Sequence, residues 1–94
     1  HVLNGNSAST NYGDGFRVFA SSDGGTSFTG NKAKNNLGQG FAINVDPNDP
    51  PAPSTLTENS ASGNYADFCE DPGAGSVLTD NSFKTTASIC LDFD

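Results

Sequence analysis

Residues 31–41 of this chain read NKAKNNLGQGF, and two other stretches repeat the same order of residues. Residues 6–16 read NSASTNYGDGF, and residues 59–68 read NSASGNYADF. Each copy has an Asn, a small residue, a second Asn and a closing Phe. Self-similarity at a period of about 20–50 residues is the sequence signature of repeat architectures. We therefore expect this chain of 94 residues to be built from stacked copies of one short unit.

Aligning the copies on their first Asn defines columns of equivalent residues and adds a fourth, degraded copy. The first Asn recurs after 25, 28 and 22 residues, and the second Asn follows it by five residues. In the fourth copy, Thr86 takes the place of the second Asn and Ile89 takes the place of the closing Phe. The Asn columns are Asn6, Asn31, Asn59 and Asn81, then Asn11, Asn36 and Asn64; the apolar columns are Leu3, Phe28, Leu56 and Leu78, then Ala8, Ala33, Ala61 and Phe83, then Phe16, Phe41 and Phe68.

Each copy divides into three short extended pieces, and no window has the periodicity of a helix. Apolar and polar residues alternate in FRVFA, FAINV and ICLDF, which follow or contain the closing position. A second piece precedes the first Asn, as in TSFTG, and a third follows it, as in KAK. We predict an all-β fold, a β-solenoid of about four coils with three short parallel strands per coil. The coils of this single domain are expected at roughly 1–25, 26–53, 54–75 and 76–94.

The spacing N-x-A-x-x-N-x-x-x-G-F resembles the right-handed parallel β-helix repeat of pectate-lyase-like proteins and of many secreted surface proteins. The resemblance covers nearly the whole chain and implies a right-handed parallel β-helix. This scaffold carries lyases, glycosidases, adhesins and structural stalks, so the resemblance implies no particular activity.

Stacking places the residues of one column above one another, which gives the repeated Asn residues a structural role. An Asn at a tight corner tolerates the left-handed conformation. Its side-chain amide can donate to one neighbouring coil and accept from the other, so both Asn columns are predicted to form hydrogen-bonded ladders. Gly15 and Gly40 are expected to supply a positive φ or a close approach at the next corner.

The two cysteines of the chain are predicted to form a disulfide. With Phe68 aligned to Ile89, Cys69 shares a column with Cys90, one residue past an inward position and facing outward. Adjacent parallel strands bring Cα atoms within disulfide range. The bond implies an oxidising compartment, so we expect an extracellular or cell-surface protein.

The acidic composition limits the partners of this protein. Eleven acidic residues against four basic residues give a net charge of −7. Such a charge repels phosphate backbones and anionic membrane surfaces, so nucleic acid is not an expected partner. No apolar run reaches the length of a transmembrane helix, so membrane insertion is not expected. Four prolines in residues 45–55, VDPNDPPAPST, predict a projecting loop, which we interpret as a tolerated insertion rather than a binding or O-glycosylated segment.

The residues of a catalytic site are not apparent in the sequence. His1 is the only histidine, so no Ser–His pair, zinc site or second copper ligand is available. Arg17 is the only arginine and has no acidic cluster in its own column, which a β-helix lyase would need. We therefore expect a protein that is not an enzyme, with lyase or glycosidase activity as an outlying alternative.

Acidic residues that share columns are the candidates for binding a cation. Glu58 and Asp80 align on adjacent coils, and we align Asp14 with Asp67, with Gln39 between them. Two carboxylates about 5 Å apart repel one another and attract a cation such as Ca²⁺. Solvated acidic faces are commoner than metal sites, so we expect no bound metal or other cofactor.

The first of two functional hypotheses is a structural role. Both ends of a short solenoid expose strand edges and an apolar cross-section that template further pairing. We expect these ends to bind copies of the protein or further solenoid coils, giving a longer solenoid or a filament. The residues expected at the ends are Leu3, Phe83, Ile89, Leu91 and Phe93.

The second hypothesis is a carbohydrate-binding module that takes a polysaccharide along a side of the solenoid. Tyr12 and Tyr65 align with Leu37 between them, and Phe19 occupies an outward position of its strand. Sugar rings stack on exposed aromatic groups of this kind. Corner aromatics also pack against their neighbours, so both interpretations stay open.

Overall fold

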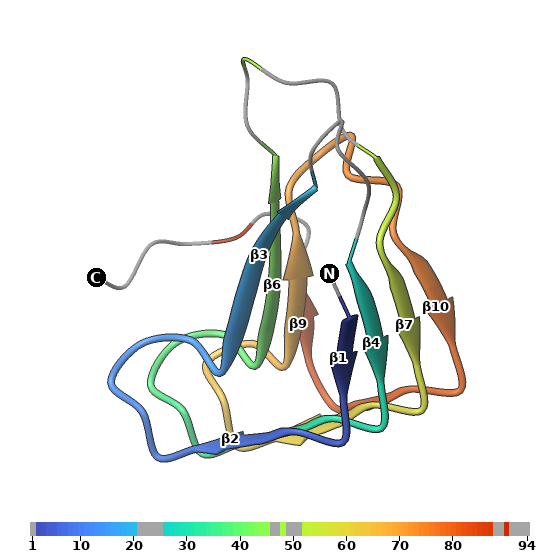
Figure 1. Cartoon of the computed structure of the whole chain (residues 1–94). Helices are drawn as coiled ribbons and strands as arrows, with labels where there is room; N and C mark the ends of the chain where they lie inside the picture. Colours follow the sequence, from blue (N-terminus) through green and yellow to red (C-terminus); the bar gives the residue numbers. More distant parts are fainter. Residues whose placement is uncertain (1, 21–25, 46–47, 49–51, 88–89, 91–94) are drawn as a thin grey trace.

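The computed structural model describes residues 2–20, 26–45, 48, 52–87 and 90, and these residues form an all-β structure (Figure 1). Twelve short strands in the described residues form three parallel sheets of four strands each, so the predicted parallel β-helix of about four coils is confirmed. Each coil contributes one strand to each sheet. The first sheet contains β1 (Val2–Asn4), β4 (Ser27–Thr29), β7 (Thr55–Thr57) and β10 (Val77–Thr79); the second contains β2 (Ser7–Ser9), β5 (Lys32–Lys34), β8 (Ser60–Ser62) and β11 (Ser82–Phe83); the third contains β3 (Phe16–Ala20), β6 (Phe41–Val45), β9 (Phe68–Glu70) and β12 (Thr86–Ala87).

The strand register agrees with the apolar columns of the first three copies. Each inward residue of the second coil pairs with its equivalents in the first and third coils, because the side-chain period of a strand keeps one face turned inward. The paired columns are Leu3, Phe28 and Leu56 in the first sheet, Ala8, Ala33 and Ala61 in the second, and Phe16, Phe41 and Phe68 in the third.

The hydrophobic core lies in the two middle coils. Phe28, Phe41, Ile43 and Leu56 are fully buried there. The ring of Phe41 stacks on that of Phe16 at 5.0 Å between centroids and meets Phe28 edge-on at 5.8 Å. Burying an apolar side chain of this size contributes about 1.5–3 kcal/mol, so these rings stabilise a chain whose hydrophobic content is low.

The tight corners of each coil are made by the residue before each ladder Asn. We expected the Asn residues themselves to adopt the left-handed conformation, and this is wrong. The preceding residue takes the positive φ, and the Asn that follows uses its backbone N–H and its side chain to reach the neighbouring coils. The left-handed residues are Gly5, Gly30, Glu58 and Asp80 at the first corner and Thr10, Asn35 and Gly63 at the second, with φ between 54° and 71°.

Gly15 and Gly40 are required by close approach between coils and not by a positive φ. A Cβ atom on Gly40 would lie 2.6 Å from the carbonyl oxygen of Asp67 and 3.1 Å from Cβ of Ala61. A Cβ atom on Gly15 would lie 2.8 Å from the carbonyl oxygen of Gly40. Contacts below 3 Å force the backbone to move, so the closing corners of the first and second coils need a residue without a side chain here.

The register of the last coil differs from the sequence-based alignment. Thr86, and not Ile89, pairs with Phe68, and Ala87 pairs with Cys69. Phe68 comes seven positions after Ala61, whereas its equivalent Thr86 comes only three positions after Phe83. The alignment assumed equal corners in every coil, and the last coil is shorter at its second corner. Thr86 consequently belongs to the Phe column and not to the second Asn column.

Two predicted segments fall largely outside the described residues. The strand expected at 89–93 has only Cys90 within them, so Ile89, Leu91 and Phe93 lie outside the described part of the chain. The Pro-rich stretch 45–55 is described at 45, 48 and 52–55 only. The part of the chain that the structure describes contains no helix that could span a membrane.

Candidate functional site

The first Asn ladder runs through all four coils and connects each coil to both neighbours. The backbone N–H and the Nδ2 of Asn31 donate to Oδ1 of Asn59 at 2.9 and 3.1 Å. The same Nδ2 also donates to the carbonyl oxygen of Leu3 in the first coil at 2.8 Å. Asn59 repeats this arrangement with Asn81 and with the carbonyl of Phe28. All donors to an Asn Oδ1 come from the preceding coil, so the ladder has one direction.

The second ladder ends at a carboxylate. Asn11 donates to Asn36, and Asn36 donates to Asn64 at 2.8 Å through its side chain. Asn64 Nδ2 then donates to Oδ1 of Asp67 at 2.9 Å, within its own coil. Asp67 is almost fully buried, and its Oδ2 accepts the backbone N–H groups of Lys84 and Thr85 at 3.0 and 3.1 Å.

The role of Asp67 was missed by the sequence reasoning, which placed this residue in one column with Asp14 and Gln39. The hydrogen bonds from Phe16 to Gly40 and from Phe41 to Asp67 put Asp67 in the column of Gly40 instead. The available signal was its position directly before the closing Phe, where the other copies have Gly. An acid in place of that Gly indicates a change in the corner.

The first coil leaves the start of the solenoid open. Within the described residues, strands β1, β2 and β3 each pair on one side only, with β4, β5 and β6. Leu3, Phe16 and Val18 are half-buried, whereas their second-coil equivalents are fully buried. Asn6 and Asn11 are exposed and, as the first members of the two ladders, receive no bond at Oδ1 from another ladder Asn among the described residues.

The last coil presents a different surface. Leu78 is half exposed, and Phe83 is half-buried because its ring stacks on that of Phe68 at 5.2 Å. Thr86 is exposed where the earlier coils have a Phe. A hollow lined by Phe68, Leu78, Thr86 and Ala87 among others remains beside these residues.

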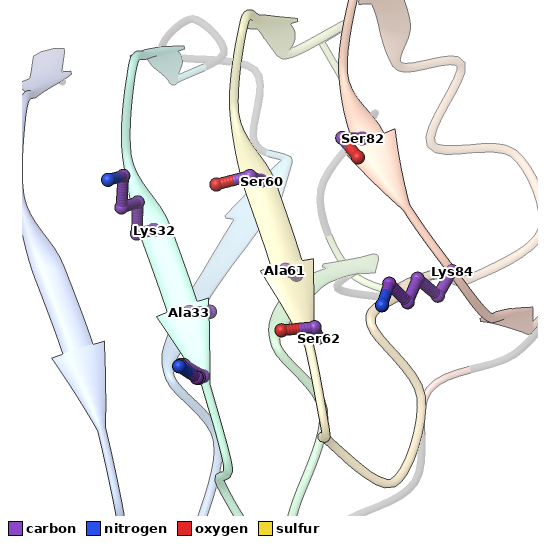
Figure 2. A pocket seen from close by; sticks show the side chains of 8 residues that line it. Lys32, Ala33, Ser60, Ala61, Ser62, Ser82 and Lys84 are labelled. Atoms are coloured by element: carbon purple, nitrogen blue, oxygen red, sulfur yellow. The ribbon is translucent and has the colours of Figure 1, made fainter.

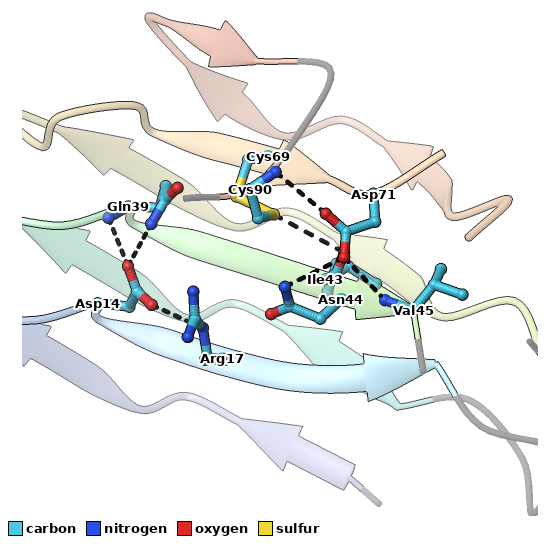
Figure 3. Close-up of a disulfide and its surroundings, with 9 residues drawn as sticks. All are labelled: Asp14, Arg17, Gln39, Ile43, Asn44, Val45, Cys69, Asp71 and Cys90. Carbon is cyan, nitrogen blue, oxygen red and sulfur yellow. Dashed lines mark hydrogen bonds and ion pairs between the residues drawn. A yellow bond between two sulfur atoms is a disulfide. The ribbon is translucent and has the colours of Figure 1, made fainter. Parts of the chain in front are cut away.

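The predicted disulfide between Cys69 and Cys90 is present, with the Cα atoms 5.2 Å apart (Figure 3). The pairing was predicted correctly from a wrong register, because Cys69 pairs along the strands with Ala87. Cys69 and its neighbour Ala42 are fully buried, although neither belongs to the hydrophobic core cluster inside the solenoid. Cys90 lies against this face, with Sγ 3.7 Å from the carbonyl oxygen of Ile43. The bond indicates a non-reducing environment.

Asp71 holds Cys90 beside β6. One carboxylate oxygen accepts the Cys90 backbone N–H at 3.2 Å, and the other accepts Val45 N–H at 3.0 Å and Asn44 Nδ2 at 3.2 Å (Figure 3). Asp71 therefore ties β6 to Cys90. No sequence pattern indicates this role, since Asp71 follows β9 at a position outside the repeated motif.

Asp14 and Arg17 form the ion pair of the first coil. Arg17 Nε lies 2.8 Å from one oxygen of Asp14, and the other oxygen accepts the N–H of Gln39 at 2.7 Å together with its side-chain amide (Figure 3). Both oxygens of this carboxylate are thus engaged, one within the first coil and the other in joining the first coil to the second. These interactions fit a structural role for Asp14.

Glu58 and Asp80 are neighbours at the first corner, as their shared column indicated. Glu58 N–H donates to the carbonyl oxygen of Thr79 at 3.0 Å, and both acidic residues are exposed. The described residues contain no group of three or more side chains that could hold a metal ion. The pair would supply two ligands, and a calcium ion takes six to eight oxygens.

An exposed apolar stripe follows the second corner. Tyr12, Leu37 and Tyr65 are 87%, 62% and 59% exposed. The bonds from Leu37 N–H to Asn11 O and from Tyr65 N–H to Gly38 O, both 2.9 Å, place the three side chains on successive coils. Phe19 is also exposed, but it lies near the end of β3 and is not part of this stripe.

The outer face of the second sheet collects most of the basic residues. Lys32, Lys34 and Lys84 project from it, which accounts for three of the four basic side chains of the chain (Figure 2). Ser60 and Ser62 on β8 lie between Lys32 and Lys84, and together with Ser82 on β11 they line a hollow (Figure 2). We name this surface the Lys/Ser face. It was not recognised in the sequence, although KAK and SFK occupy the same piece of their copies.

No protein-family model, curated protein or solved structure matches this chain. The assignment as a parallel β-helix rests on the strand pairing of the described residues.

Proposed function

We propose that this chain is a non-enzymatic structural module of an extracellular β-solenoid, extended end to end by a further coil that stacks on its first coil. The observation that carries the proposal is the open surface made by β1, β2 and β3. The resemblance of the repeat to that of right-handed, pectate-lyase-like β-helices supports this kind of scaffold. The disulfide supports a secreted location.

The first coil has the properties of an interior coil that lacks one neighbour. Leu3, Phe16 and Val18 would become as buried as Phe28 and Ile43 beneath a further coil. The unpaired edges of three parallel strands would gain hydrogen bonds at the same time, and unpaired edges template such pairing. The stability of a solenoid is a sum of coil terms and nearest-neighbour terms, so each added coil stabilises the one beneath it.

The test is a chain lengthened by a second copy of residues 2–26 placed before Val2. We expect one cooperative urea transition and a rise of roughly 2 kcal/mol in the free energy of unfolding, from the added burial of half-exposed apolar groups. The control carries Leu3→Asp and Phe16→Asp in the added copy only and should show no rise. An added coil that leaves the urea midpoint unchanged in both proteins contradicts the proposal.

Carbohydrate binding is the second candidate, favoured by the exposed stripe of Tyr12, Leu37 and Tyr65. Contiguous exposed apolar groups mark interaction surfaces, and phenol rings suit the apolar faces of sugars. A glycan array should show binding that the Tyr12→Ala/Tyr65→Ala variant loses and the Phe19→Ala control keeps. Absence of any bound glycan, or equal binding by both variants, removes this candidate.

A further inference from the structure

The last coil differs from the other three at its second corner. Residues 63–67 connect β8 to β9, whereas Lys84 and Thr85 alone connect β11 to β12. The last coil therefore has no residue in the column of Tyr12, Leu37 and Tyr65, and none in the second Asn column. A further coil stacked on this end would lack support at that corner.

Asp67 closes the second ladder chemically. An Asn side chain has both a donor and an acceptor, so it can pass a ladder from coil to coil, whereas a carboxylate only accepts. Asp67 takes the donor of Asn64 on one oxygen and the N–H groups of Lys84 and Thr85 on the other. Its side chain is buried and offers no donor to a coil beyond. Charge-assisted bonds of this kind are stronger than neutral ones, so the ladder ends on a firm acceptor.

The core is closed by two residues of the last coil, a Phe where the second sheet has Ala and a Thr where the third sheet has Phe. Phe83 stands in the Ala column and reaches across the interior, with its ring 5.2 Å from Phe68 and 5.4 Å from Phe41. Thr86 stands in the Phe column and is exposed. Terminal repeats of solenoids carry polar outer faces, and an exposed hydroxyl in place of a ring is a change of that kind.

We propose that the last coil is a terminating cap and that the solenoid extends only from its first coil. This inference rests on the proposed structural function and names the partner. That partner is a β-coil of the same direction that carries two Asn residues five positions apart. Their backbone N–H and Nδ2 groups donate to Oδ1 of Asn6 and Asn11, as those of Asn31, Asn36 and Asn59 do to the coil after them.

A second copy of the chain does not meet this requirement. Its last coil offers Asn81 above Asn6, but it has no Asn to place above Asn11. If two copies met through their first coils, the Oδ1 acceptors of Asn6 and Asn11 in one copy would face the same acceptors in the other. Only the second corner and the third sheet of the last coil are closed in this way. Elsewhere in this coil, β10 pairs with β7 in the usual register, Asn81 keeps its place in the first ladder, and Leu78 of β10 lines the hollow. Identical copies are therefore not expected to form a filament.

The experiment compares the native chain with an uncapped variant by sedimentation velocity and electron microscopy. In the variant, residues 35–40 (NNLGQG) replace Thr85, and Phe83→Ala, Thr86→Phe and Asp67→Gly restore the interior pattern. We expect the native chain to stay unpolymerised at all concentrations and the variant to form fibres, which Leu3→Lys in the variant should abolish. Fibres of the native chain, or a folded variant that sediments like the native chain, overturn the cap.

A milder variant covers the case in which the full exchange does not fold. It keeps Phe83 and Thr86 and changes only the corner, with Asp67→Gly and the six-residue insert in place of Thr85. It should sediment faster than the native chain, and equal sedimentation overturns the cap. Failure of the coil added before Val2 to stack counts against the structural function itself, so the two proposals fail by different measurements.

Discussion

At the scale of single residues, the side-chain amide of Asn is the group that joins one coil to the next. The side chain and backbone N–H of Asn59 take part in five hydrogen bonds, two accepted from Asn31, two donated to Asn81 and one donated to the carbonyl of Phe28. Polar groups buried at this depth cost free energy unless they are paired. The ladder therefore provides hydrogen-bond partners for the buried polar groups of an interior that has few apolar residues.

Asn59 inside the first ladder and Asn81 at its last position predict unequal costs for the same substitution. Asn59→Ala leaves the backbone N–H and Nδ2 of Asn31 without their acceptor and removes the Nδ2 donor to Asn81 and Phe28. Asn81→Ala affects only the bonds to Asn59 and Leu56. Each buried unsatisfied group costs on the order of 1–3 kcal/mol, so Asn59→Ala should lower the free energy of unfolding more. Urea unfolding followed by circular dichroism gives both values. Equal losses would show that the ladder is not the source of the stability.

Asp67 predicts a large loss from a substitution that keeps the shape of the side chain. Asp67→Asn turns an amide donor toward the N–H groups of Lys84 and Thr85, which both need acceptors. Hydrogen bonds to a charged group contribute about 1.5–3 kcal/mol, so the variant should lose at least one such contribution. Glu58→Gln makes the same change of charge at an exposed corner and should be nearly neutral in the same urea titration. A neutral Asp67→Asn variant contradicts the role of this carboxylate.

At the scale of elements, strands of two to five residues persist because each is paired in register with a neighbouring coil. None of them would be stable alone, and the inward Phe, Ala and Leu columns set their register. The third sheet has an additional tie, the bond between Cys69 on β9 and Cys90. Reduction of this disulfide therefore affects the third sheet first.

Removing the disulfide should lower the stability of the chain without changing its strands. The bond joins residues 21 apart, and a loop of that length contributes about 3 kcal/mol in the loop-entropy description. The Cys69→Ser/Cys90→Ser variant should show this loss in urea and should no longer respond to reductant. The native protein in reductant is the control and should reach the same midpoint. A stability unchanged by reductant contradicts the prediction.

The first three coils could be predicted from the sequence because their corners have similar lengths and every column keeps its residue type. The last coil could not, because its corner is shorter than the alignment assumed, which moved Thr86 into the Phe column. Asp67 and Asp71 were missed for a different reason. Most of their partners are backbone N–H groups brought close by stacking, and although Asp67 replaces a Gly of the motif, the spacing does not encode which groups it contacts.

At the scale of the whole molecule, stability is concentrated in the middle coils and falls toward the open first coil. Phe41 has a stacked or tilted ring on either side and is fully buried, whereas Phe16 in the same column is half-buried. The Lys/Ser face adds an uneven charge distribution, with basic groups on one sheet of an acidic molecule.

This gradient predicts different costs for one substitution in two coils. Phe41→Ala should cost about 3–5 kcal/mol, which is the usual loss for a buried Phe and a large part of the stability of a small domain. Phe16→Ala should cost clearly less, because the ring already meets water on one side. Thermal unfolding and hydrogen exchange compare the two, with β1 to β3 amides expected to exchange faster than those of β4 to β6. Equal losses and uniform exchange contradict the gradient.

The single direction of the ladders gives the solenoid an electrical polarity. Aligned amides add up as peptide dipoles do in a helix, with the donor end positive and the acceptor end negative. Chains of hydrogen bonds also polarise one another, so the effect grows with the number of coils. In the second ladder the donor end meets the carboxylate of Asp67, in the same sense that an acidic residue stabilises the start of a helix. The cap therefore compensates a dipole as well as closing a corner, and its contribution to stability should increase with every coil that is added at the other end.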